Sequence, residues 1–96
     1  MGNNRKEAVD KAIDQHREGI QVIDQQILTL LGNRMKLALQ IGVLKKEAGI
    51  AVTDKRREDE LRKAYVSYGR KHGLSPEFVE SLLEVILTES KRIQSK

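Results

Sequence analysis

The sequence predicts an all-α protein with one long helix and two shorter helices, shared between two chains of a homodimer. A heptad pattern of apolar residues fills the first half, two amphipathic stretches separated by helix-capping residues follow, and no β pattern occurs. The chain has 96 residues, which is the size of one small domain. We therefore expect a single helical domain over residues 1–96.

The first predicted helix covers residues 5–46. Its seam positions alternate in steps of four and three, which is a heptad pattern, and they include one histidine and one arginine: Val9, Ile13, His16, Ile20, Ile23, Ile27, Leu30, Arg34, Leu37, Ile41 and Leu44. No proline interrupts the segment. Gly19, Gly32 and Gly42 each cost about 1 kcal/mol relative to alanine, but the seam is regular enough to outweigh them.

The length of this helix predicts a dimer. Forty helical residues span about 60 Å, whereas a compact globule of this size is only about 30 Å across. The helix therefore overhangs its own domain, and its exposed apolar seam requires a second chain. We expect an obligate dimer that shares the long helices.

The second helix is predicted over residues 54–71, with Thr53 or Asp54 as its N-cap. Its inward-facing residues are expected to be Leu61, Ala64, Tyr65 and Tyr68. Gly73 is expected to end the helix in a left-handed conformation.

The third helix is predicted over residues 76–94. Ser75 is its expected N-cap, and Pro76, the only proline, takes the first helical position. Its inward-facing residues are expected to be Val79, Leu82, Leu83 and Ile86.

Composition excludes several function classes. The chain has no cysteine, so we expect no disulfide, no thiolate chemistry and no cysteine-ligated metal, and with two histidines we expect no His-rich metal site. The net charge of +4 can attract an anion, but acidic and basic residues are interleaved and only three aromatic residues are present. No apolar run approaches about 20 residues, and the first residues lack the apolar core of a secretory signal. We therefore expect a cytoplasmic protein that binds neither membrane nor nucleic acid.

Polar residues on the apolar stripes are the candidate site. Arg34 occupies a seam position, and Lys45 lies eleven residues later on the same helix face, with space left by Ala38 and Gly42. A buried arginine is costly unless it meets an anion. Arg34 is equally compatible with a polar seam residue that sets the register of a coiled coil.

The other two stripes also become polar at one end. The second helix begins with Asp54, Arg57 and Glu58, and the third ends with Ser90 and Gln94, one turn apart. Each group has an ordinary explanation: the first as a helix cap with local ion pairs, the second as a frayed terminus. His16 is read as a core or interface histidine.

Arg17 adds a geometric argument for the dimer. It lies seventeen residues before Arg34, about 25 Å along the helix axis. One small molecule cannot bridge both arginines of one chain, but Arg17 of one chain can approach Arg34 of an antiparallel second chain. Four cations, from Arg17, Arg34, Lys45 and Arg57, then face the carboxylates of Asp54 and Glu58. The positive surplus suits a small dicarboxylate.

The order and spacing of these residues resemble the all-helical (AroQ-class) chorismate mutases. The matching elements are an early arginine, an Asp-x9-Arg pair, Gly-x-x-Lys, Asp-x-x-Arg-Glu and Ser-x-x-x-Gln, found here as Arg17, Asp24 with Arg34, Gly42 with Lys45, Asp54 to Glu58, and Ser90 with Gln94. The match extends from Arg17 to Gln94.

The resemblance implies an intertwined homodimer that rearranges chorismate to prephenate without cofactor or metal. Lys45 and Gln94 would hydrogen-bond the ether oxygen, and Arg34 would act with them in catalysis. Arg17 of the second chain, Arg34 and Arg57 would hold the two carboxylates, with Ser90 on the ring carboxylate. Glu58 and the backbone near Asp54 would bind the ring hydroxyl. We expect a monofunctional enzyme, since the chain leaves no room for a fused domain.

Two alternatives remain open at this stage. An isochorismate pyruvate lyase has a similar scaffold, but the lyases of this type lack the glutamate found here at position 58 and carry a bulkier residue in place of Ser90. A basic helical dimer that binds nucleic acid or a protein is the second, and such binding would weaken steeply with salt.

Overall fold

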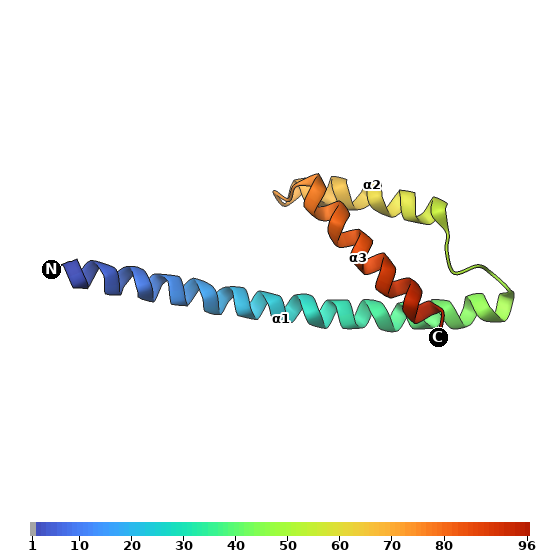
Figure 1. The fold of residues 1–96 in the computed structure, drawn as a ribbon, viewed down its shortest axis with the longest axis horizontal. Helices are drawn as coiled ribbons and strands as arrows, with labels where there is room; N and C mark the ends of the chain where they lie inside the picture. The colour runs from blue at the N-terminus through green and yellow to red at the C-terminus, as the bar shows by residue number, and fades with distance from the viewer. Residues whose placement is uncertain (1) are drawn as a thin grey trace. The chain divides into compact units, whose positions relative to one another are not determined.

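Three α-helices make up the computed structural model, which describes residues 2–96. They are α1 (Gly2–Ala48), α2 (Lys55–Lys71) and α3 (Pro76–Gln94), as shown in Figure 1. The predicted ranges 5–46, 54–71 and 76–94 agree closely, so the all-α class is confirmed. The chain divides into two units, one ending at Arg34 and one comprising Met35–Lys96, and α1 contributes to both. The intertwined homodimer stays a prediction.

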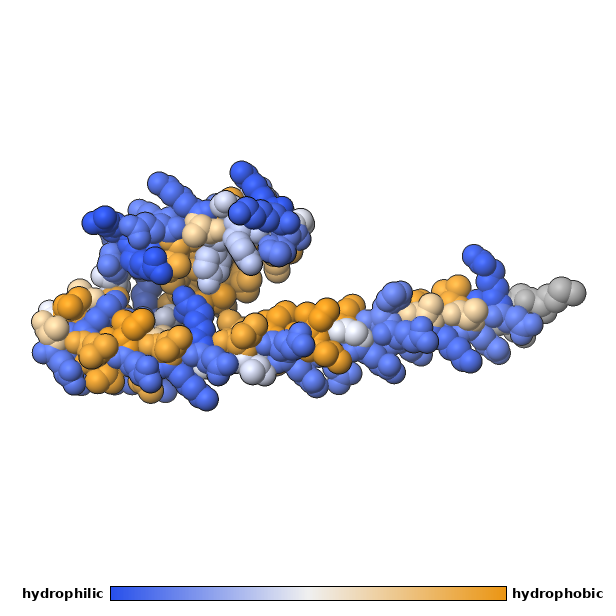
Figure 2. All heavy atoms as spheres, turned by 180° about the vertical axis from the view of Figure 1, so that it is seen from behind, coloured by the Kyte–Doolittle hydropathy of each residue, from blue (hydrophilic) through white to orange (hydrophobic). Residues whose placement is uncertain are grey.

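The N-terminal unit presents its apolar seam to solvent. Ile20, Ile27 and Leu30 are 56%, 48% and 67% exposed, and His16 is exposed as well. Figure 2 shows hydrophobic side chains at the surface of the long helix, between hydrophilic ones. An exposed stripe of this kind is typical of a surface that another helix covers.

The core of the second unit is formed mainly by α3. Its inward stripe consists of Val79, Leu83, Ile86 and Leu87, and Ala38 of α1 is buried too. On α2, Gly69 faces Val79: a Cβ atom at Gly69 would lie 2.7 Å from Val79 Cγ2. The absence of a side chain at this point therefore allows α2 and α3 to approach closely.

Capping residues define the turn between α2 and α3 as predicted. Gly73 has φ +74°, and the Leu74 N–H donates to the Gly69 carbonyl at 2.9 Å, closing α2 in the expected left-handed turn. The Ser75 hydroxyl accepts from the Phe78 N–H at 3.2 Å, and Pro76 begins α3. Asp54, rather than Thr53, caps α2.

Three residues predicted to face inward are exposed instead. Tyr68 is 66% exposed, Leu82 is 40% exposed, and Ala64 is also accessible. They line an open apolar groove of about 500 Å³ between α2 and α3. The spacing of apolar residues correctly placed these three residues on the apolar faces of α2 and α3. The two helices, however, do not bury these faces completely against each other.

By length and composition, the helix Asn4–Ala48 is long and apolar enough to cross a membrane. This finding differs from our expectation that no segment is long and apolar enough to do so. This is weak evidence of a span, because the core helix of a soluble protein passes the same test. Arg34 and Lys36 also lie within its apolar part, where a bilayer would make their charge costly. The absence of a membrane partner stays a prediction.

Candidate functional site

A cluster of polar side chains forms where the end of α3 meets the last turns of α1. Lys45 comes from α1, and Ser90 and Gln94 lie one turn apart on α3. Gly42, one turn before Lys45, makes this approach possible. A Cβ atom at Gly42 would lie 2.6 Å from both Cα and the carbonyl oxygen of Gln94. The space predicted beside Gly42 is therefore filled by the backbone of Gln94.

Hydrogen bonds connect the three side chains in a row. Lys45 Nζ donates to Gln94 Oε1 at 3.2 Å and to the Val52 carbonyl at 2.9 Å. Gln94 Nε2 donates to Ser90 Oγ at 3.2 Å, and Ser90 is buried. An ammonium carries three protons, a primary amide two and a hydroxyl one. Among these bonds, each group therefore keeps one proton that it can donate to a ligand.

The start of α2 carries the two acidic residues that the sequence assigned to the site, Asp54 and Glu58. Glu58 is 20% exposed and pairs with Lys91 of α3, with Lys91 Nζ 3.1 Å from Glu58 Oε2. Asp54 accepts from the Arg57 N–H at 3.1 Å, which confirms the helix-cap interpretation of this residue. The Arg57 side chain is 63% exposed and lies 3.8 Å from Glu60.

Two of the arginines assigned to the site, Arg17 and Arg34, belong to the N-terminal unit. Arg34 is half-buried. Arg17 is exposed, with Nη1 3.8 Å from Asp14 Oδ1. Their approach to Lys45 and Gln94, within one chain or between two, stays a prediction.

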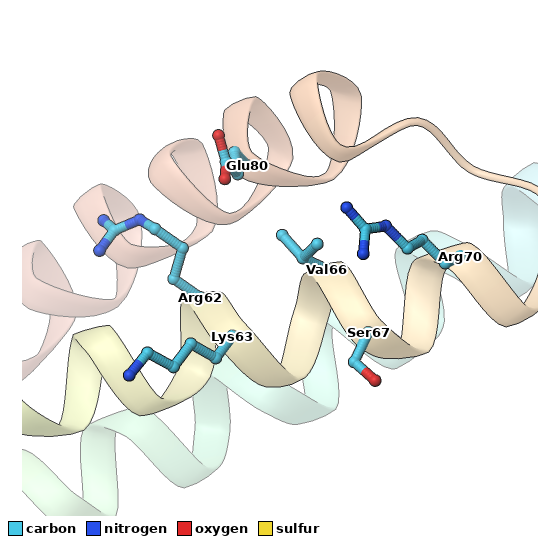
Figure 3. A pocket seen from close by; sticks show the side chains of 6 residues that line it. All are labelled: Arg62, Lys63, Val66, Ser67, Arg70 and Glu80. Atoms are coloured by element: carbon cyan, nitrogen blue, oxygen red, sulfur yellow. The ribbon is translucent and has the colours of Figure 1, made fainter.

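A second polar recess between α2 and α3 is a weaker candidate. Figure 3 shows Arg62 and Arg70 projecting from α2 toward the side on which Glu80 of α3 lies. Arg62 is already engaged, because its guanidinium lies 3.2 Å from Asp59 and 3.6 Å from Glu84. These carboxylates compensate the charge of Arg62, so this guanidinium offers little attraction to an anion.

Other charges on α3 are balanced locally. Arg92 Nε donates to Glu89 Oε1 at 2.7 Å, and this hydrogen bond together with the negative charge raises the pKa of Arg92. Among the described residues, no cluster of three or more His, Asp or Glu side chains could hold a metal ion.

Sequence reasoning missed two contacts of the candidate site residues. The partnership of Lys91 with Glu58 was not predicted, although Lys91 directly follows Ser90. The Val52 carbonyl, which accepts from Lys45, belongs to the connection between α1 and α2. Backbone carbonyls have no side-chain signature, so no sequence signal could have identified this acceptor.

The chain matches a known protein family. The model of the family "Chorismate mutase type II" matches residues 16–95. The chain therefore belongs to the chorismate mutase type II family. The match includes every residue that we assigned to the site.

The relatives are mostly longer proteins. A bifunctional chorismate mutase/prephenate dehydratase of Buchnera aphidicola (subspecies Baizongia pistaciae) is 35% identical over 80 residues, covering 83% of this chain and 22% of the relative. The Escherichia coli K12 protein of the same name is 31% identical over 74 residues, or 77% of this chain and 19% of the relative. This chain thus spans about a fifth of their length.

A relative of different specificity is more similar in size. The 4-amino-4-deoxychorismate mutase of Streptomyces pristinaespiralis is 24% identical over 89 residues, covering 93% of this chain and 69% of the relative.

Replacing Gly42 with alanine should disrupt the cluster. The new methyl group would meet the Gln94 backbone at 2.6 Å, so the end of α3 must move. We expect the free energy of unfolding to fall by about 1–3 kcal/mol in denaturant titrations, and the side-chain amide resonance of Gln94 to shift. A Gly42→Ala variant with unchanged stability and an unchanged Gln94 resonance would show that the close approach does not exist.

Proposed function

We propose that this chain is a chorismate mutase, an isomerase that converts chorismate to prephenate in aromatic amino-acid biosynthesis. The observation that carries the proposal is the hydrogen-bonded row of Lys45, Gln94 and Ser90 in a chain of this family. The proposal concerns the mutase reaction alone, because the family model that matches residues 16–95 is that of a chorismate mutase.

The reaction suits a site made of hydrogen-bond donors. In this Claisen rearrangement the ether C–O bond breaks while a C–C bond forms within the same molecule. No proton or electron leaves the substrate, so the protein needs neither a nucleophile nor a general base. It must hold a flexible dianion in a chair-like conformer and stabilise the negative charge that grows on the ether oxygen.

The unused protons of the cluster match these needs. Lys45 and Gln94 donate to the ether oxygen, which places a positive charge and an amide dipole where negative charge develops. An acceleration of about 10⁶ requires about 8 kcal/mol of differential stabilisation, and charge-assisted hydrogen bonds in a site shielded from water are strong enough to supply much of it.

The remaining groups of the substrate are assigned by charge. Its carboxylates go to the cations Arg34, Arg57 and Arg17 of the second chain, and Ser90 donates to the ring carboxylate. The hydroxyl of the substrate donates a hydrogen bond to Glu58, which is less exposed than Asp54. The backbone near Asp54 also binds this hydroxyl.

A homodimer is part of the proposal. The exposed heptad seam of the N-terminal unit and the apolar groove between α2 and α3 both support it, because exposed apolar surfaces of this kind favour association. Arg17 then enters the site of the second chain. A cytoplasmic location completes the proposal and agrees with the absence of cysteine.

The direct test is an ultraviolet assay of chorismate loss with identification of prephenate. We expect turnover by the wild type and a loss of about 100-fold or more in Lys45→Ala and Arg34→Ala, with both variants still folded and dimeric by circular dichroism and light scattering. Near-normal turnover in either variant would contradict the assignment. Pyruvate released from isochorismate would favour the lyase, and an inactive protein that shifts DNA in a salt-dependent way would favour nucleic-acid binding.

The neutral amide of Gln94 should make the wild-type rate nearly independent of pH around neutrality. In Gln94→Glu, only the protonated carboxyl can donate to the ether oxygen, and an ionised one repels the developing charge. Because the ordinary pKa of glutamate is about 4.3, kcat of this variant should be highest at acid pH and fall as pH rises through the pKa of the new side chain. A flat profile would mean that residue 94 does not contact the ether oxygen.

A shared site predicts complementation between inactive variants. Arg17→Ala and Lys45→Ala should each be inactive alone. Unfolding and refolding them together should form mixed dimers with one intact site each, restoring about a quarter of the wild-type activity at equal, random mixing. Mixing Arg34→Ala with Lys45→Ala is the matched control and should restore nothing, since both residues belong to the same chain's site.

A further inference from the structure

An ion pair between α2 and α3 joins the carboxylate assigned to the substrate hydroxyl to a lysine that the proposed function does not use. Lys91 Nζ lies 3.1 Å from one oxygen of Glu58 and 3.3 Å from the other. Their side chains are 36% and 20% exposed, respectively. The pair is thus partly shielded from water, where charges interact more strongly than at an open surface.

The ammonium group of Lys91 changes which ligands Glu58 can bind. It sits between the two carboxylate oxygens, but each oxygen has more than one lone pair, so Glu58 can still accept a hydrogen bond from a neutral hydroxyl. The charge of the carboxylate, however, is already compensated by Lys91. A second cation placed at Glu58 would gain little attraction and would meet a like charge nearby.

Two substrates of this family differ at this point. Chorismate carries a neutral ring hydroxyl, whereas 4-amino-4-deoxychorismate, the compound named for the Streptomyces pristinaespiralis relative, carries an amine there. Such an amine is largely protonated near neutral pH. The two compounds otherwise present the same carboxylates and ether oxygen to the cluster.

We infer that Lys91 is a specificity-determining residue that favours a hydroxylated substrate over its ammonium-bearing analogue by occupying Glu58. This inference rests on the proposed function. Lys91 acts through Glu58 and is not a catalytic residue. A neutral residue at position 91 would leave the Glu58 carboxylate uncompensated and free to attract the ammonium group.

The test compares kcat/KM for chorismate and for 4-amino-4-deoxychorismate in the wild type and in Lys91→Met. We expect the ratio of the two values, chorismate over amine, to fall at least about tenfold in Lys91→Met. Lys91→Arg keeps the positive charge and should keep the ratio within about threefold of the wild type. Arg92→Met is the matched control on the same helix, since Arg92 is exposed and pairs with Glu89.

A pH series separates this electrostatic effect from a structural one. In the wild type, kcat/KM for the amine substrate should rise with pH as the ammonium group loses its proton and its repulsion from Lys91. In Lys91→Met this rise should vanish or reverse, because the uncompensated carboxylate prefers the charged form. Lys91→Gln provides a second neutral variant if methionine impairs folding.

Two outcomes would overturn the inference while leaving the mutase assignment intact. One is a substrate ratio in both neutral variants within about threefold of the wild-type ratio. The other is the same pH profile for the amine substrate in wild type and variants. If the wild type converts neither compound, the proposed function is wrong and this inference falls with it.

Discussion

The candidate site depends on one steric fact, that the backbone of α3 touches α1 at a residue without a side chain. Gln94 lies so close to Gly42 that a Cβ atom would overlap its Cα and carbonyl oxygen. This contact brings Lys45, one turn further along α1, within hydrogen-bond distance of the Gln94 amide. The polar chemistry is therefore a consequence of backbone packing, and the glycine is as much a part of the site as the lysine.

The same arrangement fixes the orientation of each donor. The Gln94 amide presents its oxygen to an ammonium that can only donate and its nitrogen to a hydroxyl that accepts. If the Gln94 amide were flipped, its NH2 group would face the Lys45 ammonium, and two hydrogen-bond donors would oppose each other. The burial of Ser90 holds the other end in place. Donors that are already aligned need little reorganisation when charge develops on a bound ligand.

Most of the fold could be predicted from sequence because its signals are local. Heptad spacing predicted α1, Asp54 and Gly73 marked the two ends of α2, and Ser75 marked the start of α3. The four-residue spacing of Ser90 and Gln94 placed them on one face. What could not be predicted depends on which faces meet in space. Periodicity does not specify the angle at which helices pack. This angle determines the Lys91–Glu58 pair, the contact of Lys45 with the Val52 carbonyl, and the exposure of Tyr68 and Leu82.

The uninterrupted course of α3 also has an evolutionary consequence. Between Pro76 and Ser90 the chain is continuous helix, so inserting or deleting a single residue there would turn everything downstream by about 100°. Ser90 and Gln94 would then leave the face that meets α1, and the backbone contact would be lost. Natural variation in this stretch should therefore consist of substitutions, and length changes should accumulate elsewhere in the gene.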